Sequence, residues 1–387
     1  MHIGHYAPDM WAPGGVSSYI RRLGRAQQAR GDTVLYLGLT ETEDYDVPED
    51  LTPRFLEDES ALFAWARQTD LDVLHVHKPL STRPPDELPL LRTLHDHAAN
   101  CPSGSRHLAR TQDPCNRVSD LLTCTWGHLV DGCGSRRPTK MRQNFERIWQ
   151  ERRTLAEVPM HAVSHHVKER MVADGYEADQ IHVVHSPAPP PPAPYRPPPP
   201  SGPPRFLFLG RIVPEKGLAP LLRALTDVPD SIHLDVAGDG YQKDAMETLT
   251  TRLGLDHRVT FHGWVDPDRV PALMAQSRAV VFPSLWNEPA GLISLEAAVA
   301  GRAVIASEAG GIPEYATDDY AILVPPGKTD PLADALLHLA TDYNEAVQMG
   351  RAGRRRVPDR FDLDTFLSEI DALYDTVRTA PSSLSVT

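Results

Sequence analysis

Two carboxylates stand eight residues apart around the start of a predicted helix. Glu288 lies in a loop interrupted by Pro289 and Gly291, and Glu296 lies about one turn into the helix predicted by the apolar spacing that follows. Because Gly291 has no side chain, free backbone N–H groups at the helix start can face an anion. The stretch offers carboxylates for sugar hydroxyls and a helix terminus for phosphate, a combination that suits a sugar nucleotide.

Two cationic side chains follow a second predicted strand, at residues 206–209. Arg211 comes directly after Gly210, and Lys216 lies five residues later at a predicted helix start. Arginine binds phosphate oxygens through two parallel N–H groups, and lysine supplies a point charge. Together with a helix N-terminus, this pair can hold a pyrophosphate.

Two loops in the first half of the chain are further candidates. Gly14 and Gly15 join a predicted strand to a predicted helix, where glycines let the backbone approach an anion, although a plain tight turn is an equal explanation. His95 stands at the end of a predicted strand at residues 88–94. Ligands of parallel sheets bind beyond the carboxyl ends of strands. The alternative for His95 is a histidine satisfied by local hydrogen bonds.

All the cysteines of the chain fall in one short segment: Cys101, Cys115, Cys124 and Cys133. Such confinement in a protein of a reducing compartment indicates a structural metal more than disulfides. The spacing differs from that of a typical zinc finger because no Cys-x-x-Cys pair is present, and His107 and His128 are additional candidate ligands. Zinc, an iron–sulfur cluster (ranked below zinc), disulfides and free thiols stay open.

The elements that must position these residues alternate between strands and helices in both halves. This order predicts an α/β protein with two parallel sheets. Proline dominates residues 187–204, so we predict an extended, semi-rigid linker there. The length of 387 residues also favours more than one domain.

Composition excludes several classes of function. The net charge of -13 argues against a nucleic-acid binder, whose footprint would be basic. No run of eighteen apolar residues is present, so no membrane span is predicted. The first residues lack a basic and then apolar signal peptide, and we therefore expect a cytoplasmic protein.

The motifs resemble those of a known family. Glu288-Pro289-Ala290-Gly291 with Glu296 resembles the paired-glutamate motif of retaining glycosyltransferases of family four, and residues 210–217 resemble its diphosphate motif. The resemblance spans essentially the whole chain and is weakest at residues 101–137. It implies the GT-B fold, in which two Rossmann-like domains face each other across a cleft.

The resemblance also implies a domain plan. Its parts are an N-terminal acceptor-side domain at 1–186 with a cysteine-rich insertion at 100–137, the linker at 187–204, a nucleotide-sugar domain at 205–360, a helix at 361–380 that returns to the first domain, and a disordered tail at 381–387. At residues 185–187 the chain reads His-Ser-Pro where the family usually has Asn-Gly, which puts any donor contact from that turn in doubt.

Residue roles come from the same resemblance. Arg211 and Lys216 match the binders of the donor diphosphate, Glu296 matches the ribose ligand, and Glu288 and His95 match the groups that contact the donor sugar. The resemblance also implies that four further residues bind the donor through their backbone: Gly14, Gly15, Gly291 and Leu292.

The implied activity moves a sugar from a UDP- or GDP-sugar to a hydroxyl of a glycan, glycolipid or small molecule, with retained configuration, as in polysaccharide biosynthesis. No catalytic metal is expected, because the two cations replace it. A lipid acceptor would imply peripheral contact with a membrane. The rival hypotheses are a GT-B epimerase acting on a sugar nucleotide, and a non-catalytic protein that binds a nucleotide sugar or a metal.

Overall fold

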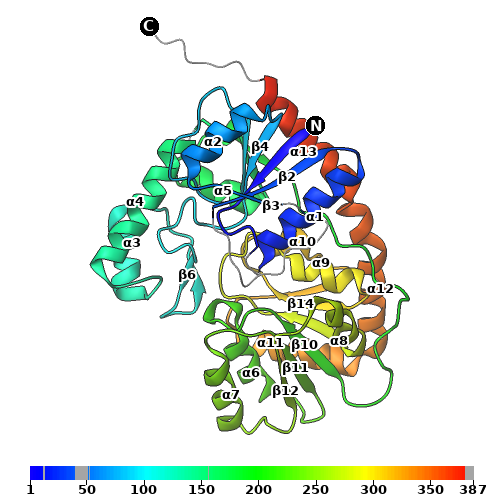
Figure 1. Ribbon diagram of the computed structural model, residues 1–387. Coiled ribbons are helices and arrows are strands. Elements are labelled where there is room, and N and C mark those ends of the chain that lie inside the picture. Colours follow the sequence, from blue (N-terminus) through cyan, green and yellow to red (C-terminus); the bar gives the residue numbers. More distant parts are fainter. Residues whose placement is uncertain (12–13, 40–50, 52, 156, 380–387) are drawn as a thin grey trace.

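The computed structural model describes the chain except for residues 12–13, 40–50, 52, 156 and 380–387. The tail predicted at 381–387 lies outside the described residues. Two parallel sheets, each covered by helices on both faces, form the two lobes of the molecule (Figure 1).

The first sheet has seven strands in the order β3-β2-β1-β4-β5-β8-β9. The strands are β1 (His2–Tyr6), β2 (Thr33–Gly38), β3 (Pro53–Phe55), β4 (Val73–Val76), β5 (Leu90–Leu94), β8 (Met160–Ala162) and β9 (Ile181–Val183). Every adjacent pair is parallel. The central strands are buried on both faces, as expected of apolar runs in a parallel sheet.

The second sheet has six parallel strands in the order β12-β11-β10-β13-β14-β15. The strands are β10 (Arg205–Leu209), β11 (His233–Ala237), β12 (Val259–Gly263), β13 (Ala279–Phe282), β14 (Ala303–Ser307) and β15 (Ala321–Val324). Two apolar cores occupy its faces, one around Leu221 and one around Leu295.

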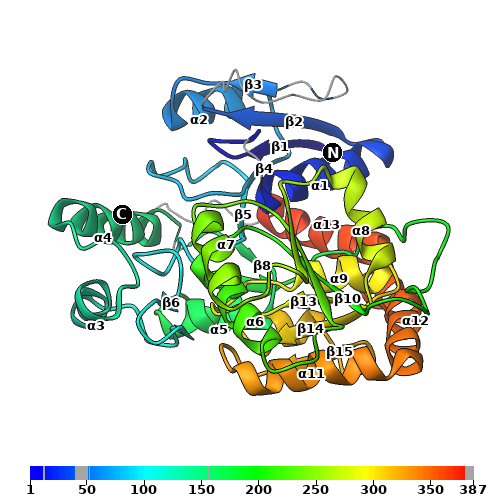
Figure 2. The same cartoon turned by 90° about the horizontal axis from the view of Figure 1, so that it is seen from below.

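Helices flank both sheets. Those of the first half are α1 (Gly15–Ala29), α2 (Glu59–Gln68), α3 (Leu121–Trp126), α4 (Pro138–Leu155) and α5 (His165–Ala173). Those of the second half are α6 (Leu218–Leu225), α7 (Lys243–Arg252), α8 (Val270–Gln276), α9 (Leu292–Val299), α10 (Ile312–Tyr315), α11 (Thr329–Thr341), α12 (Tyr343–Arg360) and α13 (Leu363–Thr379). Figure 2 shows α11 and α12 on the outer side of the second lobe.

The last helix belongs spatially to the first lobe, as Figure 1 shows. Phe366, Ile370 and Tyr374 of α13 lie in the same buried core as Ile3 of β1 and Tyr19 of α1. The chain therefore crosses between the lobes twice, once through residues 185–204, which contain no helix or strand, and once between α12 and α13.

The segment between β5 and α4 projects from the first lobe and reaches toward the second (Figure 1). Its regular structure is limited to the antiparallel pair β6 (His107–Leu108) and β7 (Asp113–Pro114), α3, and a π-helix, η1 (Gly127–Asp131).

Candidate active site

A lysine and a glutamate from separate loops meet at the edge of the second sheet. Lys216 ends the short 3-10 helix η3 (Pro214–Lys216), and Glu288 lies between β13 and α9. The Nζ of Lys216 donates to Oε1 of Glu288 at 2.6 Å. The Ser284 hydroxyl donates to the same oxygen at 2.6 Å. Glu288 is only 5% exposed, so its charge is balanced by Lys216 rather than by water.

Backbone packing fixes the positions of these two loops. Gly217 has a φ of 74°, and a Cβ there would lie 1.8 Å from the carbonyl oxygen of Pro283. On the other side, Gly310 has a φ of 63°, and a Cβ would lie 2.3 Å from the carbonyl oxygen of Glu288. Only glycine fits at either position, because the left-handed backbone and the close approach both exclude a side chain. Glu288 is thus held from both sides.

Arg211 follows β10 and points into solvent. Its side chain is exposed, and its guanidinium makes no hydrogen bond or ion pair with another described residue. Lys216, five residues later, is half-buried, with its Nζ 5.3 Å from the ring centre of Trp286. The loop after β10 therefore carries an exposed guanidinium at Arg211 and a half-buried ammonium at Lys216.

Glu296 lies on α9, one turn after the helix start. Gly291 is the N-cap of α9 and has no side chain to satisfy the first N–H groups, and Leu292 begins the helix half-buried. Burial raises the pKa of the Glu296 carboxyl, and the positive charge of Arg22 opposes that rise. Arg22 belongs to α1 of the first lobe, so this interaction crosses between the lobes.

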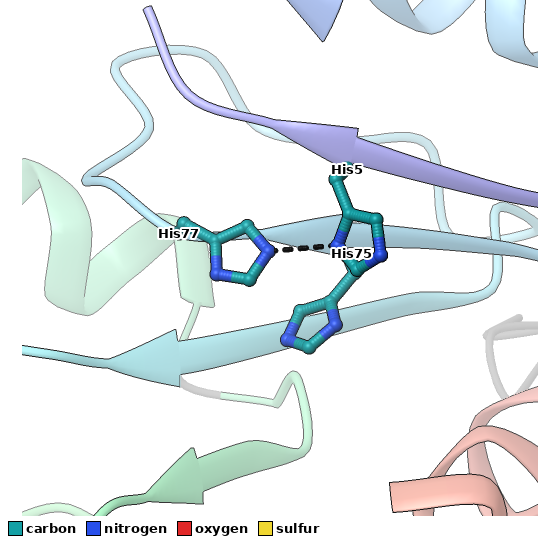
Figure 3. Close-up of side chains that lie close together, drawn as sticks. All are labelled: His5, His75 and His77. Atoms are coloured by element: carbon teal, nitrogen blue, oxygen red, sulfur yellow. Dashed lines mark hydrogen bonds between the residues drawn. The ribbon is translucent and has the colours of Figure 1, made fainter. Parts of the chain in front are cut away.

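A buried cluster of histidines lies under the carboxyl edge of the first sheet, and Figure 3 shows its three central members. One ring nitrogen from each of His5, His75 and His77 lies within 4.8 Å of the other two, a spacing that could suit a metal ion. However, every ring nitrogen of the three has a hydrogen-bond partner among the described residues. The cluster is therefore one chain of hydrogen bonds rather than a set of free ligands.

The direction of this chain follows from its far end. His161 Nε2 lies 2.8 Å from the carbonyl oxygen of Val184, so this nitrogen carries a proton. Burial lowers the pKa of His161 to about 4, so near neutral pH the ring is neutral and its Nδ1 accepts. The Thr93 hydroxyl donates to that Nδ1 at 2.9 Å, and its oxygen accepts from His75 Nε2 at 2.5 Å.

The same reasoning orders the middle of the chain. The Tyr374 hydroxyl donates to His75 Nδ1 at 2.8 Å and accepts from Gln27 Nε2 at 3.0 Å. The Oε1 of Gln27 then accepts from His5 Nε2 at 2.7 Å. His5 is neutral because burial lowers its pKa to about 4, so its Nδ1 accepts from His77 Nε2 at 2.9 Å.

His95 closes the chain at the candidate site. Its Nε2 donates to His77 Nδ1 at 3.0 Å. Burial holds the pKa of both rings well below the usual value, so both are neutral. The Nδ1 of His95 is left with a lone pair and can accept, but not donate, a hydrogen bond. Tyr19, one turn into α1, packs edge-on against His95 at 4.6 Å, and the exposed Gly14 and Gly15 precede it at the helix start.

The loops of the two lobes meet at Asn287. His97 Nε2 donates to the carbonyl oxygen of Asn287 at 2.6 Å, and Asn287 Nδ2 donates to the carbonyl oxygen of Cys115 at 2.8 Å and to Asn116 Oδ1 at 3.0 Å. The residue before Glu288 therefore contacts both the loop after His95 and the cysteine-rich segment.

A second contact between the lobes is made by Glu314 of α10. Its carboxylate accepts from the backbone N–H groups of His165 and His166 at the start of α5 and from His185 Nε2 at 2.8 Å. Burial alone would raise the pKa of Glu314, but these hydrogen bonds hold it below the usual value. An acidic side chain at a helix N-terminus is stabilising.

Cys101, Cys115, Cys124 and Cys133 all line one cavity, and all four are free thiols. The disulfide alternative is therefore not what the structure has. Burial raises the pKa of the Cys124 thiol to about 11 and that of Cys133 to about 12. His128 lines the same cavity, whereas His107, the other candidate ligand, does not.

Several residues of this site were not predicted from the sequence. Asn287 and Glu314 are close in the sequence to residues that the motifs did indicate, so the motifs could have been used to predict them. Arg22, Gln27 and Tyr374 gave none, because each reaches the site from a helix face far away in the chain.

Two family models match the chain. One, described as glycosyl transferases group 1, matches residues 195–356, and the other, glycosyltransferase family 4, matches residues 13–190. The chain belongs to this glycosyltransferase family. The relatives that it matches are named as glycosyltransferases, which agrees with the prediction of an enzyme of this class.

Curated relatives agree with this placement. The chain is 33% identical over 177 residues to a GDP-mannose-dependent alpha-(1-6)-phosphatidylinositol monomannoside mannosyltransferase of Mycobacterium tuberculosis, covering 43% of this chain and 46% of that protein. It is 30% identical over 171 residues to an uncharacterized glycosyltransferase of Methanocaldococcus jannaschii, covering 43% and 44%. Both matches span less than half of the relative. A phosphatidyl-myo-inositol mannosyltransferase of Mycobacterium leprae matches at 28% over 100% of both chains.

Solved structures show the same fold. The sucrose-phosphate synthase of Thermosynechococcus elongatus superposes with a TM-score of 0.74 at 22% identity, covering 97% of this chain and 98% of that one. HepE of Anabaena, solved in complex with UDP, has a TM-score of 0.68 at 18% identity, covering 97% and 100%. The predicted GT-B fold is confirmed. No described helix has the length and apolar character needed to cross a membrane.

Proposed function

We propose that the protein transfers a glycosyl unit from a nucleoside-diphosphate sugar to a hydroxyl acceptor, with retained anomeric configuration. The observation that carries the proposal is the contact between Lys216 and Glu288, which come from the loops after β10 and β13. A bound donor would separate this pair, because its diphosphate would bind Lys216 and its sugar hydroxyls would bind Glu288. We further propose that residues 1–186 and 205–360 act as the two domains, joined by 187–204.

Charge on the leaving group is the main target of catalysis in this reaction. Arg211 and Lys216 stabilise the negative charge that grows on the diphosphate as the glycosidic bond breaks. Gly291 and Leu292 present the uncapped start of α9 to the same phosphates. Glu296 accepts hydrogen bonds from the ribose, and the positive charge of Arg22 opposes the rise in the pKa of that carboxyl that burial causes.

His95 orients the donor sugar. Because its Nδ1 is an obligatory acceptor, it selects a hydroxyl of the sugar, and the neutral ring adds no positive charge beside the anomeric carbon. Gly14 and Gly15 leave room for donor and acceptor beside it. The acceptor proton goes to an oxygen of the departing phosphate, and no catalytic metal takes part.

The nucleobase is the next question. HepE was solved with UDP, and the mycobacterial relative is GDP-mannose-dependent. We propose that one of these two nucleotides is the natural leaving group, in the cytoplasm, where sugar donors for polysaccharide synthesis are made. A ligand at a hundred times its Kd stabilises a protein by about 2.7 kcal/mol, so thermal shifts with UDP, GDP and ADP will rank the bases.

The variants Lys216→Ala and Arg211→Ala test the proposal. In an assay of donor hydrolysis and transfer, each should lower kcat by about a hundredfold or more, because each removes a positive charge that stabilises the leaving diphosphate. Lys243→Ala, on α7 of the same lobe, is the matched control and should leave kcat unchanged. Full turnover by the double variant would remove the phosphate role, and formation of an epimeric sugar without any acceptor would favour an epimerase.

We propose that the cysteine-rich segment contacts an anionic membrane surface, where the acceptor lies. The cysteine-rich segment exposes large apolar side chains, Leu122 at 81% and Trp126 at 60%, together with Leu121 and Leu129. Basic side chains follow them, and all are exposed: Arg136, Arg137, Lys140 and Arg142. Apolar and basic groups on one segment suit an interface with anionic lipid.

Sedimentation with vesicles of phosphatidylglycerol tests this contact. Leu122→Glu with Trp126→Glu should abolish co-sedimentation, and vesicles of phosphatidylcholine alone should bind little. Leu337→Glu, an exposed leucine on α11 of the second lobe, is the control and should still bind. Binding by the double variant equal to that of the parent would contradict the proposal.

A further inference from the structure

The cysteine-rich segment has almost no apolar core of its own. Between residues 103 and 137, all of which the structure describes, no apolar side chain is buried, and Cys101 and Pro102 at the border are the nearest that are. The secondary structure consists of two-residue strands, the six-residue α3 and the π-helix η1. A segment that buries so little must be held by something other than hydrophobic packing, and small domains of this kind depend on disulfides or metals.

The four cysteines lie where such a group would act. They come from four different parts of the segment: the loop after β5, the residue after β7, helix α3, and the turn after η1. All line the same cavity, and none is in a disulfide. Four free thiols around one cavity form a ligand set for a metal centre.

The spread of the thiols distinguishes the kinds of centre. Among the described residues, the groups of three or more ligand atoms within 4.8 Å of one another include none of these cysteines. A single zinc ion with bonds of about 2.3 Å would draw its four sulfurs to within about 3.8 Å of one another. A [4Fe–4S] cluster sits between its four thiolates and keeps them farther apart than a single ion does. Because no three of the four sulfurs gather as closely as one zinc ion requires, their arrangement favours the cluster.

The cavity wall contains a second sign of a ligand. His128 is fully buried, and its Nδ1 donates to the carbonyl oxygen of Ser135 at 3.0 Å. Its Nε2 is buried without a partner among the described residues. Arg106 lines the cavity as well: its terminal nitrogens donate to Asp174 and to the carbonyl oxygen of Arg117, but its buried Nε–H has no partner among the described residues and could donate to a sulfur atom. An unsatisfied buried nitrogen is costly unless a further group belongs in the cavity.

We propose that Cys101, Cys115, Cys124 and Cys133 bind a [4Fe–4S] cluster that holds the cysteine-rich segment in its fold. The cluster is a structural staple, and it takes no part in the bonds that are made or broken during glycosyl transfer.

The proposed cluster site is also connected to the donor site by hydrogen bonds. The carbonyl oxygen of Cys115 and the side chain of Asn116 receive both N–H bonds of the Asn287 amide, and Glu288 follows Asn287 in the chain. Loss of the cluster would free these acceptors and loosen the loop that holds Glu288. This consequence rests on the proposed function, whereas cluster binding does not.

Composition analysis of protein purified without oxygen tests the proposal. We expect about four irons and four sulfides per chain, visible absorption that dithionite bleaches, and a Mössbauer spectrum of a cubane cluster. One zinc per chain without sulfide, or four thiols that titrate freely with no metal bound, would overturn it. Because neither result depends on glycosyl transfer, the cluster and the proposed function can fail separately.

Variants locate the ligands. Cys115→Ser and Cys124→Ser should each lose at least half of the iron, and Ser105→Ala, in the same segment, should keep all of it. His128→Gln should also keep its iron, since four thiolates complete the cluster, and iron loss equal to that of a cysteine variant would overturn the four-cysteine set. Should the cysteine variants not fold, the parent protein stripped by chelator provides the alternative. Iron with sulfide should restore its circular dichroism, and restoration by zinc alone would count against the cluster.

Discussion

At the scale of single residues, one backbone carbonyl determines the protonation of a histidine several partners away. The oxygen of Val184 can only accept, which orders His161 and, through its partners, leaves His95 with a bare Nδ1. Each ring is neutral because burial lowers its pKa, so no step in the chain is ambiguous. The site therefore receives a histidine whose role as an acceptor is set before any ligand binds.

The variant Tyr374→Phe interrupts this chain of hydrogen bonds between His75 and Gln27. Without the hydroxyl, His75 Nδ1 and Gln27 Nε2 each lose a buried partner, which should cost about 1–3 kcal/mol of unfolding free energy. The tautomer of His95 is no longer specified, so kcat/KM for the donor should also fall. Nitrogen-15 spectra of the histidine rings and steady-state kinetics measure the two effects.

Tyr343→Phe is the matched control for this prediction. Its hydroxyl donates to the carbonyl oxygen of Pro198, away from the histidines. It should change kcat/KM little. An unaltered His95 resonance in Tyr374→Phe would contradict the proposed order.

The buried histidines also predict how stability depends on pH. His5 and His161 have pKa values of about 4 in the folded protein, below the ordinary 6.5 that the unfolded chain recovers. Below pH 6.5 the unfolded state binds more protons, so stability is complete above that pH and falls as the pH drops toward 4. Each such histidine removes up to about 1.4 kcal/mol per pH unit in this window. Urea unfolding at pH 7.5, 6.5 and 5.5 measures the slope, and a flat profile would contradict neutral burial.

At the scale of elements, the site depends on loops that approach each other at the backbone. Gly217 and Gly254 have nearly the same left-handed conformation, with φ of 74° and 70°. A Cβ at Gly217 would meet the carbonyl of Pro283, whereas one at Gly254 would meet nothing within 4 Å. Gly254→Ala should therefore cost only the backbone strain, about 1–2 kcal/mol.

Gly217→Ala should cost clearly more than Gly254→Ala in urea unfolding, and it should reduce transfer because Lys216 moves away from Glu288. Equal costs for the two variants would mean that the loop can move aside, and the tight seating of Lys216 would then not matter for the fold.

The elements also show which features the sequence could reveal. Lys216, Glu288 and Glu296 were predictable because each lies in a strand–loop–helix unit that its own residues specify. Helix α12 was missed, since it is strongly polar and contains Pro358, which normally ends a helix. The histidine chain was also missed, because it is assembled from four strands, from Gln27 on α1 and from Tyr374 on the last helix, and no local pattern encodes such contacts.

At the scale of the whole molecule, a few polar contacts hold the lobes in the arrangement that the site requires. His97 and Asn287 join the lobes on one side, and Glu314 joins them on the other. Polar contacts suit an enzyme whose lobes separate to exchange ligands, because they can re-form with water when the lobes part, whereas an apolar interface would keep them closed.

Glu314→Ala tests this arrangement of the lobes. It removes a carboxylate that accepts two backbone N–H bonds and the His185 ring nitrogen, and hydrogen bonds to charged groups contribute about 1.5–3 kcal/mol each before exposure reduces them. The lobes should open more often, so the radius of gyration in solution should rise and transfer should fall about tenfold, the equivalent of about 1.4 kcal/mol. Glu345→Ala removes a carboxylate paired with His338 inside the second lobe and should do neither. Binding of the nucleoside diphosphate should survive in both variants, because the ligands that we propose for it lie in the second lobe alone. A loss of that binding in Glu314→Ala would mean that the contact supports the donor site itself rather than the approach of the lobes.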